Sequence, residues 1–238
     1  MRGDVGYPVR LRFTKRGRVR FISHRDVARA FERAFRIVTL PTAFTAGFVP
    51  RPKVSFGLAL SVGYESDGEY LDVELTERED PDTLCAPISE ALPEGLDVTG
   101  AAALQDRAPA LQEAITSVSY RIEIECDDRP TDGGLTRLVD DAMASPSLVV
   151  TRRRKGVDVV EDVRPAIRRL ETIGREELEL EVQTHPRGVR PAEIVGTLAG
   201  DVSVRSVLRT HQWIERGSAR LEPLEADTRP HVPEARAS

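Results

Sequence analysis

The apolar and polar positions in the first half of the chain follow two different periods. Residues 9–15 alternate Val, Leu and Phe with polar side chains, which predicts a half-buried strand. Residues 24–38 place apolar side chains every three or four positions, which predicts a helix that ends before Leu40-Pro41. The other elements expected in this half are strands at 54–60 and 70–75, a helix at 82–92 and a strand at 96–103.

The second half repeats this order after a linker at 105–110. Its last part, 217–238, is rich in Pro, Ala, Glu and Arg without any periodicity, which is typical of a disordered tail. The elements expected before the tail are a strand at 118–125, a helix at 135–143, a hairpin of 148–153 with 157–163, a short helix or irregular segment at 167–173, a strand at 177–182, a helix at 191–198 and a strand at 202–214.

Two successive runs of strand, helix, strand, strand, helix, strand favour an α+β fold of two tandem ferredoxin-like units. Each unit is expected to form a four-stranded antiparallel sheet with its helices on one face. The predicted boundaries are a basic N-terminal unit at 8–104, an acidic C-terminal unit at 115–216 and the disordered tail at 217–238.

The composition supports a folded chain and excludes several classes of protein. Of 238 residues, 40% are hydrophobic and 31% are charged, which is enough apolar material for a core. No run approaches the roughly 18 apolar residues of a membrane span, and the first residues lack the apolar region of a secretory signal. Cys85 and Cys126 are too far apart for a CxxC or iron–sulfur motif. We therefore expect a cytoplasmic protein without membrane contact, metal or cofactor.

The net charge of −5 conceals an asymmetry along the chain. Residues 1–56 contain thirteen Lys and Arg against three acids, a net charge of +10, so the remaining residues have a net charge of −15. Opposite signs in two parts of one chain indicate an end that faces a polyanion.

Many of these cations fall on the first predicted strand and helix. Four helix arginines are spaced by four, four and three residues, so they form one stripe opposite the apolar face. The strand cations Arg10, Arg12 and Lys15 are expected near the turn residues Arg16, Arg18 and Arg20. Such a surface suits a phosphate backbone, although a solvated face that pairs with acids elsewhere in the chain is an equal alternative. The candidate nucleic-acid-binding residues are Arg18, Arg20, His24, Arg25, Arg29, Arg33, Arg36, Phe48, Arg51, Lys53, Arg154 and Lys155.

Two loops contribute to this set. The turn-rich loop 47–53 places Phe48 beside Arg51 and Lys53, and an exposed ring beside cations suits stacking on unpaired bases. The alternative is a proline-stiffened connection with a buried ring. The run 152–155 places four cations at the tip of the predicted hairpin, either as a second contact with an anionic partner or as a charged edge that resists strand pairing.

The segment Ser23-His24-Arg25-Asp26 contains residue types of a hydrolase without their usual spacing. Neighbours at a helix start do not face one another as nucleophile, base and orienting group, whereas Ser23 and Asp26 fit a capping box. His24 is the one candidate for acid/base catalysis, and positioning of a phosphate is its alternative role. The acids expected on a solvated strand face, and not around a metal, are Glu65, Asp67, Glu69, Asp72 and Glu74.

Several segments carry a resemblance to a known family. They are RFISHRD at 20–26, FERA at 31–34, GFVPRPKVSFG at 47–57, EYLDV at 69–73, Lys155-Gly156 and VRPAI at 163–167. Together they resemble the radical-SAM-linked protein family, a bacterial domain of unknown function that occurs alone or behind cobalamin-binding radical SAM enzymes. The resemblance implies a radical SAM partner and work on RNA or the translation apparatus, and it supplies no catalytic residues.

Three functions are compatible with the sequence. The first is a non-catalytic accessory of a radical SAM enzyme that binds RNA or presents an RNA or ribosomal substrate. The second is a small RNA-processing or RNA-modifying enzyme that uses His24, and the third is a protein–protein adaptor without RNA contact. The radical chemistry itself is not expected here, because it needs three closely spaced cysteines and the chain has two.

Overall fold

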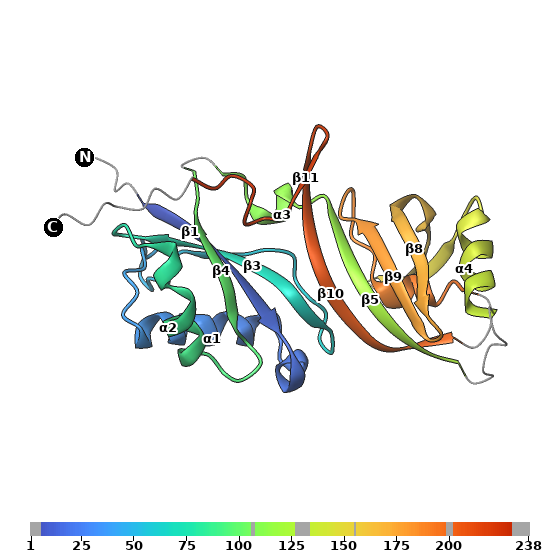
Figure 1. The fold of residues 1–238 in the computed structure, drawn as a ribbon, viewed down its shortest axis with the longest axis horizontal. Helices are drawn as coiled ribbons and strands as arrows, with labels where there is room; N and C mark the ends of the chain where they lie inside the picture. The colour runs from blue at the N-terminus through green and yellow to red at the C-terminus, as the bar shows by residue number, and fades with distance from the viewer. Residues whose placement is uncertain (1–5, 106–107, 127–133, 155, 199–201, 230–238) are drawn as a thin grey trace. The chain divides into compact units, whose positions relative to one another are not determined.

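The computed structural model describes residues 6–105, 108–126, 134–154, 156–198 and 202–229. The chain divides into two compact units: unit 1 contains residues 1–115 and 213–238, and unit 2 contains residues 116–212. Both combine a few helices with a sheet whose strands pair mostly in antiparallel fashion (Figure 1). The predicted α+β class is therefore confirmed.

Unit 1 follows the predicted order of elements. Its strands lie in the order β4-β1-β3-β2, and each of these neighbouring pairs is antiparallel. Short helices η1 (Gly17–Phe21), η2 (Pro81–Thr83) and α3 (Leu111–Ala114) lie between or after the main elements. The main elements are β1 (Tyr7–Lys15), α1 (His24–Ile37), β2 (Val54–Phe56), β3 (Glu65–Leu75), α2 (Cys85–Ala91) and β4 (Val98–Ala103).

The core of unit 1 lies between its sheet and the two helices α1 and α2, which cover the same face (Figure 1). α1 buries Val27, Phe31 and Phe35, because side chains three or four positions apart share one side of a helix. The ring of Phe31 packs edge-on against Phe13 of β1, with 4.7 Å between the ring centres. The opposite side of α1 is thereby left to solvent.

The C-terminal segment covers the other face of this sheet, so the prediction of a disordered tail from residue 217 is corrected for residues 217–229. Strand β11 (Ala219–Leu221) pairs with the end of β10, and Ala226 is buried. The Pro223 carbonyl accepts a hydrogen bond from Arg10 at 3.0 Å, and Arg229 donates to the carbonyl of Ala103 at 2.8 Å. The segment is held by these polar contacts and has no apolar period. The hydrophobic pattern of the sequence therefore does not indicate that it is ordered. Residues 230–238 lie outside the described residues.

Unit 2 has the strand order β10-β5-β9-β8. A separate two-stranded sheet is formed by β6 and β7, which are the predicted hairpin. The elements of this unit are β5 (Ser117–Cys126), α4 (Gly134–Ala144), β6 (Val149–Arg154), β7 (Val157–Asp162), η3 (Arg164–Ala166), β8 (Ile167–Gly174), β9 (Glu177–Gln183), α5 (Pro191–Val195) and β10 (Val202–Arg216), whose residues from Trp213 onward belong to unit 1.

The segment at 167–173 differs from the prediction. It was expected to be a short helix or irregular, but it is strand β8, which pairs with β9. The register shifts between Ile167 and Arg169 and again between Thr172 and Gly174. Because each shift reverses which side chains point inward, the alternation that identifies a strand is broken in the sequence.

Candidate nucleic-acid interface

The N-terminus of α1 is fixed by a local cap, as the sequence predicts. The Ser23 hydroxyl accepts a hydrogen bond from the Asp26 backbone N–H at 3.3 Å and donates one to the Asp26 carboxylate at 2.7 Å. The hydroxyl contact is the main cause of a lowered pKa for Asp26. Ser23 and Asp26 thus serve the helix, and they are not a catalytic pair.

The four arginines of α1 (Arg25, Arg29, Arg33 and Arg36), which we call the arginine stripe, are all exposed. Arg29 pairs with Asp26 of the same helix at 3.2 Å, and Arg36 donates to the backbone carbonyl of Glu32. Within the described residues, the side chains of Arg25 and Arg33 have neither an ion pair nor a hydrogen bond. The stripe therefore leaves much of its charge to solvent or to an external anion.

The strand cations are not part of this surface, which corrects the expectation for Arg10, Arg12 and Lys15. Arg10 is fully buried and holds both carboxylate oxygens of Asp72, at 2.7 and 2.9 Å. Lys15 is 3% exposed, and its ammonium donates to two backbone carbonyls of the segment around η1. Arg12 lies half-buried, 3.9 Å from Glu222. These side chains stabilise unit 1.

The cations before α1 differ from one another. Arg18 is exposed, and its side chain has no ion pair within the described part of the chain. Arg20 is half-buried, lies over the ring of Phe21 at 4.7 Å and is 3.8 Å from Glu65. Phe21 itself is exposed, so this end of unit 1 presents a guanidinium stacked on an exposed ring.

The loop after α1 is a narrow turn with an exposed ring at its tip. Thr45 donates its backbone N–H to the Arg51 carbonyl at 2.8 Å, and the backbone N–H of Arg51 donates to the Thr45 hydroxyl at 3.1 Å. These bonds close the loop, and Phe48 at its tip is fully exposed. The Arg51 side chain is exposed, whereas Lys53 pairs with Glu74 at 2.8 Å.

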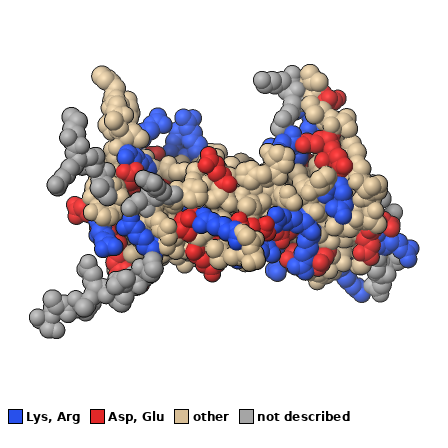
Figure 2. Space-filling model, turned by 90° about the horizontal axis from the view of Figure 1, so that it is seen from above, with Lys and Arg blue, Asp and Glu red and all other residues tan. Residues whose placement is uncertain are grey.

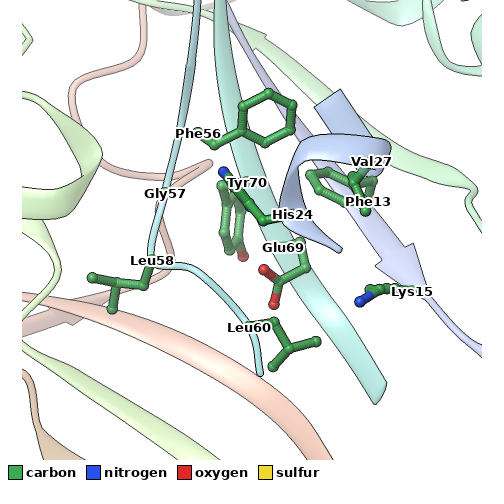
Figure 3. A pocket seen from close by; sticks show the side chains of 10 residues that line it. All are labelled: Phe13, Lys15, His24, Val27, Phe56, Gly57, Leu58, Leu60, Glu69 and Tyr70. Carbon is green, nitrogen blue, oxygen red and sulfur yellow. The ribbon is translucent and has the colours of Figure 1, made fainter. Parts of the chain in front are cut away.

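His24 lies beside a small pocket at the start of α1 (Figure 3). Phe13, Phe56 and Leu60 form apolar walls, and the polar lining includes Lys15 and the carboxylate of Glu69, which is 7% exposed. The imidazole packs edge-on against Phe56 at 5.0 Å. The enclosed space admits about one water molecule. The sequence pattern identifies His24 as a candidate, but it does not indicate that Lys15 and Glu69 are buried beside it.

The acids of β3 do not form a solvated face, which corrects that prediction. The Arg16 guanidinium contacts Asp67 at 2.6 Å and Glu65 at 3.4 Å. As described above, Asp72 pairs with Arg10 and Glu74 pairs with Lys53. The register of β1 against β3 places Arg10 opposite Asp72, and a single strand pattern cannot reveal that pairing. Among the described residues there is no group of three His, Cys, Asp or Glu side chains that could hold a metal ion.

The basic hairpin tip is described only in part. Arg152 is mostly buried and contacts Glu193 and, at 3.7 Å, Glu161. Arg153 is exposed. The side chains of Arg154 and Lys155 lie outside the described residues.

Figure 2 views the molecule from above, which for unit 1 is the side of the sheet opposite to α1. On that face Lys and Arg side chains lie next to Asp and Glu side chains. The whole of α1 contains two acids, so the arginine stripe is a more uniformly positive surface than the face in Figure 2. In the described part of the chain, no helix is long and apolar enough to cross a membrane.

The fold and this surface define an α+β protein with mostly antiparallel sheets and an exposed arginine-rich helix. Residues 9–191 match the family described as "Uncharacterized protein conserved in bacteria (DUF2344)", and the chain belongs to this family. Among solved structures it is similar to a chain in the crystal structure of a Cbf5-Nop10-Gar1 complex, with 12% sequence identity and a TM-score of 0.45. That similarity covers 88% of this chain and 49% of the other. No curated protein matches the chain.

Proposed function

We propose that this protein binds RNA through the arginine stripe and acts as a non-catalytic accessory of a radical SAM enzyme, presenting RNA or a ribosomal substrate to it. The RNA-binding part rests on one observation, the exposure of Arg25 and Arg33 without a partner among the described residues. The radical SAM partner rests on the sequence resemblance alone, and the chain's two distant cysteines leave the radical chemistry to that partner.

The C-terminal segment covers one face of the sheet in unit 1, which supports the opposite side, with its helices, as the binding surface. In each unit the strand order, with the order of elements, supports a ferredoxin-like arrangement, in which the helix-free sheet face often binds nucleic acid. In unit 1 that face is occupied by the chain's own residues around Pro223, which bury Arg10. An RNA strand would therefore meet the arginine stripe, with Arg18 and the loop around Phe48 as further contacts.

The proposal is tested by replacing the two unpartnered arginines together. We expect the Arg25→Ala/Arg33→Ala variant to bind a fluorescein-labelled 20-nucleotide single-stranded RNA about tenfold more weakly at 100 mM salt, since two phosphate contacts are lost. The matched control is Arg121→Ala/Arg169→Ala in unit 2, which removes the same charge from exposed side chains that are already ion-paired. Equal loss in both variants, or no binding by the native protein, would reject the proposal.

A second candidate function is an RNA-processing enzyme that uses His24 as acid or base. The observation in its favour is the pocket in which His24 joins the buried Lys15 and Glu69, since clustered titratable groups are typical of catalytic sites. Incubation of the purified protein with end-labelled RNA tests it: cleavage or modification that disappears in His24→Ala but persists in Arg25→Ala/Arg33→Ala would favour the enzyme.

A further inference from the structure

The segment just before α1 presents an aromatic ring between cations. Phe21 of η1 is 61% exposed, although phenylalanine is among the residue types most often buried in a core. The exposed residues of the segment 17–25 are Gly17, Arg18, Phe21, His24 and Arg25, and the segment contains no acid. An exposed ring among cations is typical of surfaces that bind single-stranded nucleic acid.

The backbone on both sides of Phe21 is held by hydrogen bonds. The buried Lys15 ammonium donates to the carbonyl of Arg20 at 3.3 Å and to that of Ile22 at 3.1 Å. The backbone N–H of Gly63, in the turn before β3, also donates to the Arg20 carbonyl, at 2.8 Å. The ring is therefore exposed from an ordered backbone, and a group that is ordered in advance loses little conformational entropy on binding.

Glu65 of β3 fixes the cation that lies against the ring. Its carboxylate accepts a hydrogen bond from the Gly17 backbone N–H at 2.7 Å. It also contacts the guanidinium groups of Arg16 and Arg20, at 3.4 and 3.8 Å. The Arg20 guanidinium lies 4.7 Å from the centre of the Phe21 ring. Because the guanidinium covers one face and the side chain is still largely exposed, the other face is open to a second planar group.

The cations on either side of the ring keep their charge available. Arg18 lies three residues before Phe21 and Arg25 lies four residues after it. Both side chains are exposed, and within the described residues neither has an ion pair or a hydrogen bond. Asp26, the acid next to Arg25 in sequence, is held by the helix cap and by Arg29. A single nucleic-acid strand offers the matching groups, because phosphates flank each unpaired base.

We propose that Phe21 stacks on an unpaired base of the bound RNA, while Arg18 and Arg25 contact phosphates on either side of that base. The inference rests on the RNA binding proposed above, and it adds that the site selects single-stranded over duplex RNA. In a duplex the bases are already paired and stacked, so the ring has no base face to reach. The surface fits a base better than a protein, because the exposed residues of 17–25 include no aliphatic side chain.

The first experiment measures the affinity of the full-length protein for fluorescein-labelled RNA of one sequence, single-stranded or annealed to its complement. We expect Phe21→Ala to bind the single strand about tenfold more weakly than the native protein, since the stacking of one base is lost. Its affinity for the duplex should change by less than about twofold. The salt dependence of binding to the single strand should stay the same, because stacking releases no counterions.

Three further variants separate stacking from other contacts. Phe21→Trp keeps a stacking face and should bind the single strand within about twofold of the native protein or more tightly. Phe21→Leu keeps apolar volume without a π face and should lose about as much affinity as Phe21→Ala. Val62, on the turn bonded to η1, is 58% exposed, and Val62→Ala should change the affinity by less than about twofold. Unchanged circular dichroism and melting temperature show that each variant is folded.

The second experiment locates the stacked base. Single-stranded RNA that carries 5-iodouridine is irradiated in complex with the native protein, because this base crosslinks to an aromatic ring on which it stacks. Digestion and mass spectrometry should identify an adduct on Phe21, and this adduct should be absent from Phe21→Leu.

The outcomes distinguish failure of the stacking from failure of RNA binding itself. If the native protein binds single-stranded RNA and Phe21→Ala binds it equally well, or if no adduct forms on Phe21, the stacking is rejected and RNA binding stands. Native-like binding by Phe21→Leu, or equal losses for the single strand and the duplex in Phe21→Ala, would also reject the stacking. Absence of RNA binding by the native protein would reject both proposals.

Discussion

The cations of unit 1 fall into two groups according to their surroundings. Arg10 and Lys15 are buried, and backbone or carboxylate oxygens satisfy their donors. Arg25 and Arg33 are exposed and lack such partners within the described residues. A buried cation is costly to leave unpaired, whereas an exposed one is held in water at little cost. The first group stabilises the fold, and the second is available for binding.

Breaking the buried ion pair should destabilise unit 1. Asp72→Ala leaves the fully buried Arg10 without its carboxylate, and we expect the free energy of unfolding to fall by about 3–5 kcal/mol in urea titrations. The double variant Arg10→Met/Asp72→Leu removes both charges and should be less destabilised than Asp72→Ala. Equal losses would mean that packing, and not the unpaired charge, sets the cost.

Phe48 should affect RNA binding in a way that differs from the arginines. Stacking releases no counterions, so Phe48→Ala is expected to weaken binding of single-stranded RNA by about 1–3 kcal/mol without changing the salt dependence. Phe48→Tyr keeps a stacking ring and serves as the control. A changed salt slope in Phe48→Ala would argue that the ring orders the neighbouring cations instead.

At the scale of elements, α1 connects the core to the proposed surface. Its apolar side packs on the sheet, and its cap begins the helix at His24. The direction of the arginine stripe therefore follows from the same periodicity that buries Phe31 and Phe35. Any change that frays the first turn should loosen Arg25 before it affects Arg36, because the cap acts only on the first turn.

The cap provides a test that separates helix stability from chemistry. Ser23→Ala removes the hydroxyl that accepts from Asp26, and we expect a loss of about 1 kcal/mol in the free energy of unfolding. Ser23→Thr should restore most of it. Because the hydroxyl has no catalytic role in this account, any catalysed RNA reaction should persist in Ser23→Ala; its complete loss there would contradict the assignment.

The elements differ in how well the sequence predicts them, for physical reasons. α1 is predictable because period, cap and terminating proline agree. β8 is not, because two register shifts break its alternation. The exposure of the arginine stripe is predictable, because it follows from the spacing of its four arginines along α1. The burial of Arg10 does not follow from spacing, since it depends on which strand lies opposite and on a segment more than 150 residues away.

At the scale of the whole molecule, the C-terminal segment packs on the sheet that the first strands of the chain form. The phenol of Tyr70 on β3 donates to Glu222 at 3.4 Å, and the segment around Pro223 covers the same sheet face. This cover raises the pKa of Tyr70 above its ordinary value of 10.0, through burial first and the Glu222 charge second. The pKa of Tyr70 therefore depends on whether the segment around Pro223 encloses the phenol.

The raised pKa predicts a loss of stability in alkali. Below pH 10 the phenol is protonated in both the folded and the unfolded chain, so its contribution to stability is fully present. Above pH 10 the unfolded chain releases the proton first, and stability falls as the pH rises towards the folded pKa. Urea unfolding between pH 8 and 11 should show this fall, and Tyr70→Phe should show a shallower one. Identical profiles would mean that the segment does not enclose Tyr70.

The central claim, that unit 1 binds RNA by charge, is tested most directly by the salt dependence of binding. If about five phosphates of single-stranded RNA contact the arginine stripe and its neighbours, the logarithm of the association constant should fall against the logarithm of salt with a slope near −3.5. The Arg25→Ala/Arg33→Ala variant should flatten that slope by about one to two units. A native slope near zero, or no measurable RNA binding at low salt, would contradict the claim.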